Sequence, residues 1–186
     1  MPKVDRRQRR TLIADALMRV AAEHGLEAVS LRQVAAEAGV SAGMVQHYFR
    51  TKDEMMAFAM EVVRERNQAR VTEAVARLGD SPQPRELLRT IIGTLLPLAD
   101  ESRADGRVAL AFLAYTAVRP TASEVLRDET ARMVGFFESL IPVHHQARGL
   151  LALMEGIGVY LLGGQYTPDE ARATLEAQLD LLYGSP

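Results

Sequence analysis

Residues 30–52 read SLRQVAAEAGVSAGMVQHYFRTK, and this stretch decides the fold. Ser30 is followed three residues later by glutamine, which is the pattern of a capped helix start. The apolar residues behind it share one helical face: Leu31, Val34, Ala35 and Ala38. Gly39 suits the left-handed conformation that ends a helix, and Ser41 can cap a second helix that runs through Tyr48. The stretch therefore predicts a helix-turn-helix, whose second helix has the size to enter the major groove of DNA.

The motifs in this stretch resemble those of the TetR family of bacterial transcriptional regulators. The resemblance rests on AGVS-x-G at 38–43 and HYF-x-x-K at 47–52, preceded by a helix that ends at Gly25. It implies a dimer that binds operator DNA and whose C-terminal domain encloses a small molecule. Met44 and Gln46 depart from the pattern, since threonine and tyrosine are frequent there. Glutamine can read adenine where the tyrosine would meet a phosphate, so the operator sequence stays open.

Basic residues gather around the helix-turn-helix. Residues 1–52 hold nine Lys and Arg against five Asp and Glu, a net charge of +4, whereas the remainder carries −6. DNA is therefore expected to meet the N-terminal part. The residues predicted to reach DNA are Arg6, Arg7, Arg9, Arg10, Ser30, Arg32, Ser41, Ala42, Gly43, Met44, Gln46, His47, Tyr48 and Lys52. Val45 and Phe49 are predicted to be core.

The rest of the chain has helical periodicity and almost no strand signals. A first apolar face at residues 12–20 precedes the helix-turn-helix. Six further helices are predicted at about 52–78, 87–95, 105–118, 121–140, 146–162 and 168–183. The fold class is therefore all-α with about nine helices. A helix-turn-helix DNA-binding domain is predicted at 1–50 and a helical ligand-binding and dimerisation domain at 51–186, and the clearest linker lies at 79–84.

The last two predicted helices are candidates for a dimer interface. One carries an apolar stripe at i, i+4, i+8 and i+11, and the other carries small residues that permit close helix approach. The predicted interface residues are Gly149, Ala152, Gly156, Gly163, Ala171, Leu175, Leu179 and Leu182. The same pattern would also serve an intramolecular core. A second apolar side with Ala173, Ala177 and Leu181 favours the dimer, because one monomer core would not need it.

Aromatic residues and methionines concentrate in the middle of the C-terminal part. In an arbitrary protein such a cluster is more often core than pocket, but the TetR resemblance implies a cavity for a largely apolar effector. The predicted ligand-binding residues are Arg64, Asn67, Phe112, Tyr115, Thr116, Met133, Phe136, Phe137, Met154 and Tyr160. Glu155 either faces solvent beside the dimer interface, which we favour, or offers a charge to a cation. The segment from Met154 to Leu182, which contains EGIGVYLLGGQYTPDEA, is similar to the C-terminal part of BetI-type regulators.

Other classes of function find little support. There is no P-loop, GxSxG or HExxH motif, so an enzyme is not predicted and no cofactor is expected. Cysteine is absent, and the adjacent His144 and His145 lack a carboxylate at ligand spacing, so a surface loop is predicted there and no metal site. The charged N-terminus and the short apolar run at 149–164 predict a cytoplasmic protein that does not enter a membrane.

These patterns together predict a dimeric repressor that a small molecule releases from operator DNA. The ligand would favour a conformation in which the two recognition helices are wrongly spaced for successive grooves. One alternative is a ligand-independent DNA-binding or nucleoid-associated module, whose C-terminal part only dimerises. An enclosed void in the C-terminal core would distinguish the two.

Overall fold

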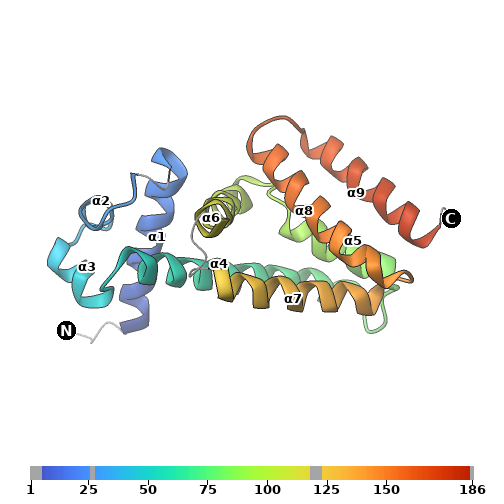
Figure 1. Cartoon of the computed structure of the whole chain (residues 1–186), viewed down its shortest axis with the longest axis horizontal. Coiled ribbons are helices and arrows are strands. Elements are labelled where there is room, and N and C mark those ends of the chain that lie inside the picture. The colour runs from blue at the N-terminus through green and yellow to red at the C-terminus, as the bar shows by residue number, and fades with distance from the viewer. Residues whose placement is uncertain (1–5, 26–27, 118–122, 185–186) are drawn as a thin grey trace. The chain divides into compact units, whose positions relative to one another are not determined.

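The computed structural model describes residues 6–25, 28–117 and 123–184, and the regular structure within these ranges is helical (Figure 1). The α-helices are α1 (Arg6–His24), α2 (Leu31–Glu37), α3 (Ala42–Tyr48), α4 (Lys52–Ala76), α5 (Pro84–Leu95), α6 (Asp100–Ala117), α7 (Ser123–Leu140), α8 (Ala147–Leu162) and α9 (Pro168–Tyr183). A short 3-10 helix, η3 (His144–Gln146), precedes α8. Within the described residues, the predicted all-α class with about nine helices is confirmed.

The helices form two compact units. The N-terminal unit consists of the chain up to Arg66 together with Arg107–Ala114, and the C-terminal unit consists of Asn67–Gly106 and the chain from Tyr115 onward. Two helices, α4 and α6, contribute to both units. The predicted domain boundary at residue 50 remains a prediction.

The N-terminal unit is held together by one apolar face from each of its helices. In α1 the buried residues include Ile13, Ala14 and Leu17. Val34 and Ala35 of α2 and Val45 of α3 are also buried, and α4 adds Met55, Met56, Phe58, Ala59, Val62 and Val63. Since each helix buries only part of its surface, the other faces stay available.

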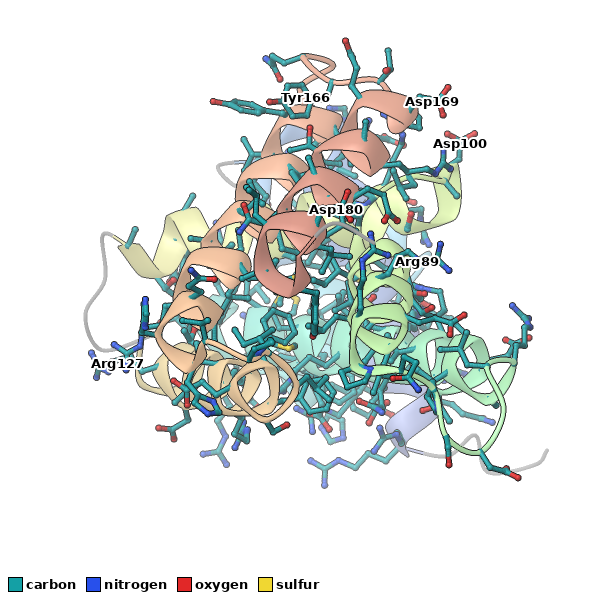
Figure 2. The ribbon with its side chains drawn as sticks, turned by 90° about the vertical axis from the view of Figure 1, so that its right-hand side faces the viewer. Arg89, Asp100, Arg127, Tyr166, Asp169 and Asp180 are labelled. Atoms are coloured by element: carbon teal, nitrogen blue, oxygen red, sulfur yellow. The ribbon has the colours of Figure 1, made fainter. Side chains whose placement is uncertain are left out.

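The C-terminal unit packs α5, α7, α8 and α9 around a second core, and the contacts of α5 with α7 and α9, and of α8 with α7 and α9, define its layers. Figure 2 views this unit with α9 toward the reader. Asp180 of α9 lies beside α5, where its Oδ1 accepts a hydrogen bond of 2.6 Å from Arg85. The same guanidinium donates to Glu176 at 2.8 Å. These carboxylates raise the pKa of Arg85, the hydrogen bond to Asp180 contributing most.

Most predicted helix ends are confirmed by their capping bonds and glycine conformations. Thr167 forms the full capping box of α9 with Glu170. Two glycines that end helices have positive φ, 79° at Gly25 and 85° at Gly79. Ser30 Oγ accepts from the Gln33 backbone N–H at 3.2 Å, but the Gln33 side chain bonds to the Ser30 hydroxyl rather than completing a box.

Several boundaries differ from the prediction. Helix α6 begins at Asp100 instead of residue 105, and Ser102 Oγ accepts from the Ala99 backbone N–H at 3.2 Å at this end. Helix α4 ends at Ala76, two residues earlier than predicted, and α5 begins at Pro84. The predicted start of a helix at residue 121 lies outside the described residues. The predicted linker at 79–84 lies inside the C-terminal unit.

The leucine stripe of α9 is part of the core of a single chain. The four residues predicted to form the dimer interface on this helix are buried: Ala171, Leu175, Leu179 and Leu182. Helix α9 contacts α5 and α8 of the same C-terminal unit, so the stripe packs within the chain, and a dimer interface on α9 stays a prediction. The pattern served the intramolecular core, which was the other interpretation open from the sequence.

Among the helices that the structure describes, none combines the length and the apolar character needed to cross a membrane.

Candidate nucleic-acid interface

The recognition helix α3 is anchored at both of its ends. Ser41 Oγ accepts a hydrogen bond of 3.1 Å from the backbone N–H of Met44, which satisfies one free donor of the first turn. At the other end Phe49 is fully buried, and its N–H donates to Val45 O at 2.9 Å. Val45 is also fully buried, so both residues are core, as predicted. Anchoring one face of α3 leaves its opposite face to solvent.

The exposed face of α3 carries small and polar side chains: Ala42, Gly43, Met44, Gln46 and His47. Tyr48 is half-buried and packs edge-on against His47, with ring centroids 5.2 Å apart. Glutamine and histidine can bond base edges or phosphates, so the face has the chemistry that a DNA groove requires. Structure and sequence thus agree on which side of α3 is free.

The turn before α3 needs a glycine, whereas Gly43 inside α3 does not need one for folding. Gly39 has φ 64°, and Val40 N–H donates to Ala35 O at 3.0 Å, which closes the end of α2. A Cβ built at Gly43 would meet only Ser41 Oγ, at the ordinary distance of 3.9 Å. The fold therefore has room for a side chain at position 43.

The turn from α3 into α4 places further basic residues beside the recognition helix. Thr51 Oγ1 accepts from the Glu54 backbone N–H at 3.0 Å, and Glu54 Oε2 accepts from the Arg50 backbone N–H at 2.9 Å. Lys52, which begins α4, is half-buried. The Arg50 side chain is exposed, and the sequence interpretation missed it as a candidate although it stands inside the HYF-x-x-K motif.

The predicted N-terminal arginine cluster separates into two kinds of residue. Arg6 is exposed and Arg9 is half-buried. Arg7 instead forms an ion pair with Glu65 of α4. Arg10 lies over the rings of Phe49 and Phe58, so its guanidinium packs inside the N-terminal unit, and its predicted contact with DNA stays a prediction. Two further predicted DNA contacts, Arg32 and the helix cap Ser30, are exposed.

A hollow of about 540 Å³ runs along α1 in the same unit. It is lined by Arg7, Gln8, Thr11, Leu12, Asp15 and Arg19. Three of these residues form ion pairs: Arg7 with Glu65, Asp15 with Arg66 and Arg19 with Glu37. The hollow therefore lies among polar groups that are paired, and it does not contain the predicted aromatic lining.

The residues predicted to bind an effector are divided between the two units. Arg64 and Phe112 belong to the N-terminal unit, and the other eight belong to the C-terminal unit. Phe136 and Tyr160 are 40% and 48% exposed, so they point outward from a single chain. Phe137 is fully buried in the core, with Met133 and Met154 packed at its edge. Thr116 is buried, Tyr115 is half-buried, and Asn67 is bonded to Arg70.

Three titratable residues of the C-terminal unit are exposed: His144, His145 and Glu155. Glu155 lies on the exposed side of α8, as we favoured, and partial desolvation raises the pKa of its carboxyl above the usual value. His144 and His145 are exposed in η3, and the His144 ring Nδ1 lies 2.6 Å from Glu138 O. A group of three or more potential metal ligands is absent from the described residues.

Comparisons with known proteins agree on both parts of the chain. Residues 13–58 match the model of bacterial regulatory proteins of the tetR family, and residues 84–184 match the C-terminal domain of BetI-type transcriptional repressors. The regulator BetI of Stenotrophomonas maltophilia is 31% identical over 92% of this chain and 91% of its own length. The regulator PksA of Bacillus subtilis is 40% identical, but the match covers only 62% of this chain and 55% of PksA. A solved transcriptional regulator from Rhodococcus sp. RHA1 is 32% identical, with a TM-score of 0.83 over 93% of this chain and 95% of that one.

Proposed function

The chain belongs to the TetR family of transcriptional regulators and carries a BetI-type C-terminal domain, and on this basis we propose that it represses transcription by binding operator DNA as a dimer. A small molecule then releases it. The observation that carries the proposal is the exposed polar face of α3 on its buried anchors Val45 and Phe49. This arrangement suits a helix inserted into the major groove, which is about 12 Å wide.

Each part of the interface has a proposed role. Gln46 and His47 project from α3 toward base edges, and the free space at Gly43 lets the DNA backbone approach the helix closely. Tyr48 and Lys52 contact phosphates, with Arg50 as a further phosphate contact. Ser30, Ser41 and Arg32 flank the groove at the starts of α2 and α3.

The proposed dimer interface uses the exposed sides of α8 and α9. The leucine stripe of α9 is buried within the chain, so the contact falls to the opposite side, where Leu181 is 80% exposed. The exposed small and apolar residues of the two helices are Gly149, Ala152, Val159, Gly163, Ala173, Ala177 and Leu181. Small side chains permit close packing of two helix pairs. Dimerisation places two recognition helices on half-sites about 34–36 Å apart, since one short helix reads too few base pairs.

The effector is proposed to bind in the C-terminal unit near Tyr115, Thr116, Met133 and Met154. Thr116 is a buried polar residue, and the two methionines are half-buried at the edge of the core, where flexible side chains adapt to an apolar ligand. Helix α4 belongs to both units, so a change in the C-terminal unit can reach the helix-turn-helix along one continuous helix. The ligand shifts the equilibrium only by its different affinity for the two conformations.

Melting and operator binding, measured together, test the effector proposal. An inducer at a hundred times its dissociation constant should stabilise the fold by about 2.7 kcal/mol. It should also weaken operator affinity through the same coupling free energy. A compound that raises the melting temperature and leaves operator affinity unchanged is bound without being an inducer. If a broad library of apolar compounds produced no thermal response, the ligand-independent module would be favoured.

A further inference from the structure

The side chain of Arg10 extends from α1 to the end of the recognition helix α3. Its guanidinium carbon lies 4.2 Å from the ring centroid of Phe58 and 4.8 Å from that of Phe49. The two rings pack against each other with centroids 5.6 Å apart and planes inclined by 51°. A guanidinium over aromatic faces is attracted by the negative charge of the ring faces. Arg10 thereby joins α1 to a ring pair that spans α3 and α4.

A carboxylate beside Arg10 connects it to the backbone of the same turn. Glu54 Oε1 lies 3.6 Å from the Arg10 guanidinium, and Glu54 Oε2 accepts the 2.9 Å hydrogen bond from the Arg50 N–H. The two oxygens of one carboxylate therefore contact α1 and the residue directly after Phe49. The rings and the carboxylate together hold the turn between α3 and α4 against α1.

The Arg10 side chain is largely covered by its neighbours. Its side chain is 28% exposed, and among the described residues its Nε is a buried atom without a hydrogen-bond partner. Arg32 and Arg50 are exposed residues by contrast. To reach a phosphate, the Arg10 guanidinium would have to leave both rings and Glu54.

We propose that Arg10 is a positioning residue for operator recognition, which acts through Phe49 on the orientation of α3 without touching DNA. The inference rests on the proposed DNA-binding function. Phe49 follows the last residue of the recognition helix and its N–H bonds to Val45, so fixing its ring fixes the helix end. Hydrogen bonds to base edges are directional and suffer most from a small displacement, whereas phosphate contacts tolerate it better.

Two variants separate positioning from direct contact. Arg10→Met keeps an apolar side chain on the rings and removes the charge, whereas Arg10→Lys keeps a cation there. Binding is measured against the best duplex selected from a random pool by the wild-type protein, and against a scrambled duplex of equal length. Arg10→Met should lose about tenfold in affinity for the selected duplex, in line with a desolvated cation–π pair. It should leave the scrambled duplex and the salt slope unchanged, and Arg10→Lys should restore most of the preference.

Arg32→Met is the matched control, because Arg32 is an exposed arginine of the same unit. If it contacts a phosphate, its loss should weaken both duplexes and reduce the salt slope by about 0.9. The same behaviour of Arg10→Met would overturn the proposal, as would unchanged affinity for both duplexes in a folded variant.

If Arg10→Met does not fold, the rate of chemical modification of Arg10 in the wild-type protein tests the proposal instead. With phenylglyoxal and mass spectrometry, Arg10 should react more slowly than Arg32 before any DNA is added, and DNA should not change its rate. Protection of Arg10 that arises only with the selected duplex would refute the positioning role. A wild-type protein that binds the selected and the scrambled duplex equally well would refute the proposed function instead. In that case, slow modification of Arg10 in the free protein would still confirm that its side chain is packed.

Discussion

The recognition helix and the last helix bury one face each but leave opposite kinds of surface exposed. Helix α3 rests on Val45 and exposes small and polar residues, including Gln46 and His47. Helix α9 rests on leucines and exposes Ala173, Ala177 and Leu181. The first surface can form hydrogen bonds with DNA, whereas the apolar residues of the second gain by excluding water against another apolar surface. The exposed face, and not the buried one, indicates the partner.

The largest effect is expected from a substitution on the buried side of α9. Leu179 is fully buried in the C-terminal core, so Leu179→Ala should lower the free energy of unfolding by about 2–5 kcal/mol. Urea unfolding of the purified variant measures the loss. Leu12→Ala, at a residue 39% exposed on α1, is the control and should change stability far less. A stable, well-folded Leu179→Ala monomer would return this stripe to the dimer interface.

The exposed side of α9 should decide the oligomeric state without affecting the fold. Ala177→Glu combined with Leu181→Glu places two carboxylates in the proposed apolar contact, where burying them unpaired is strongly disfavoured. Sedimentation should show a monomer, and circular dichroism should show unchanged helix content. Leu12→Glu serves as the matched control and should remain a dimer. If the double variant also sedimented as a dimer, the interface would lie elsewhere.

Substitutions at a predicted base contact on α3 and at a predicted phosphate contact at the start of α4 should affect DNA binding differently. Gln46→Ala should change the ranking of operator variants, since a bidentate contact of glutamine with adenine contributes about 1–3 kcal/mol of discrimination. Lys52→Ala should weaken all sequences alike and reduce the salt slope by about one. Fluorescence anisotropy over a salt series measures both. Equal loss on every operator variant would show that Gln46 reads no base.

The smallest effect is expected at the capping box that begins α9. Hydrogen bonds from the backbone N–H and the hydroxyl of Thr167 to the Glu170 carboxylate lower the pKa of that carboxyl, and the backbone bond contributes most. A lowered folded pKa means that the stabilisation is present above the ordinary pKa of glutamate and is lost as the pH falls through the folded value. Glu170→Gln should therefore lower the melting temperature slightly at pH 7 and by less at pH 3. An equal difference at both pH values would assign the effect to packing.

Features fixed by near neighbours in sequence were predictable, and features that depend on distant packing were not. The ends of α3 and α9 follow from Ser41 and Thr167, which bond within their own first turns. The start of α6 was missed because its first turn is polar and gives no apolar period. An apolar stripe looks the same in sequence whether its partner is the same chain or a second one, so the burial of Leu175 and Leu179 within the chain could not be predicted. The packing of Arg10 was not predicted, because Phe49 and Phe58 are far from it in the sequence and nothing nearby distinguishes it from the neighbouring arginines.

A DNase I footprint on the selected operator tests the central claim most directly. A dimer with two copies of α3 should protect two half-sites related by two-fold symmetry, with centres about 34–36 Å or a multiple apart. The Ala177→Glu, Leu181→Glu variant should lose this footprint at the same protein concentration. Protection that covers the duplex without sequence preference, or an undiminished footprint from a monomeric variant, would contradict a dimeric operator-binding regulator.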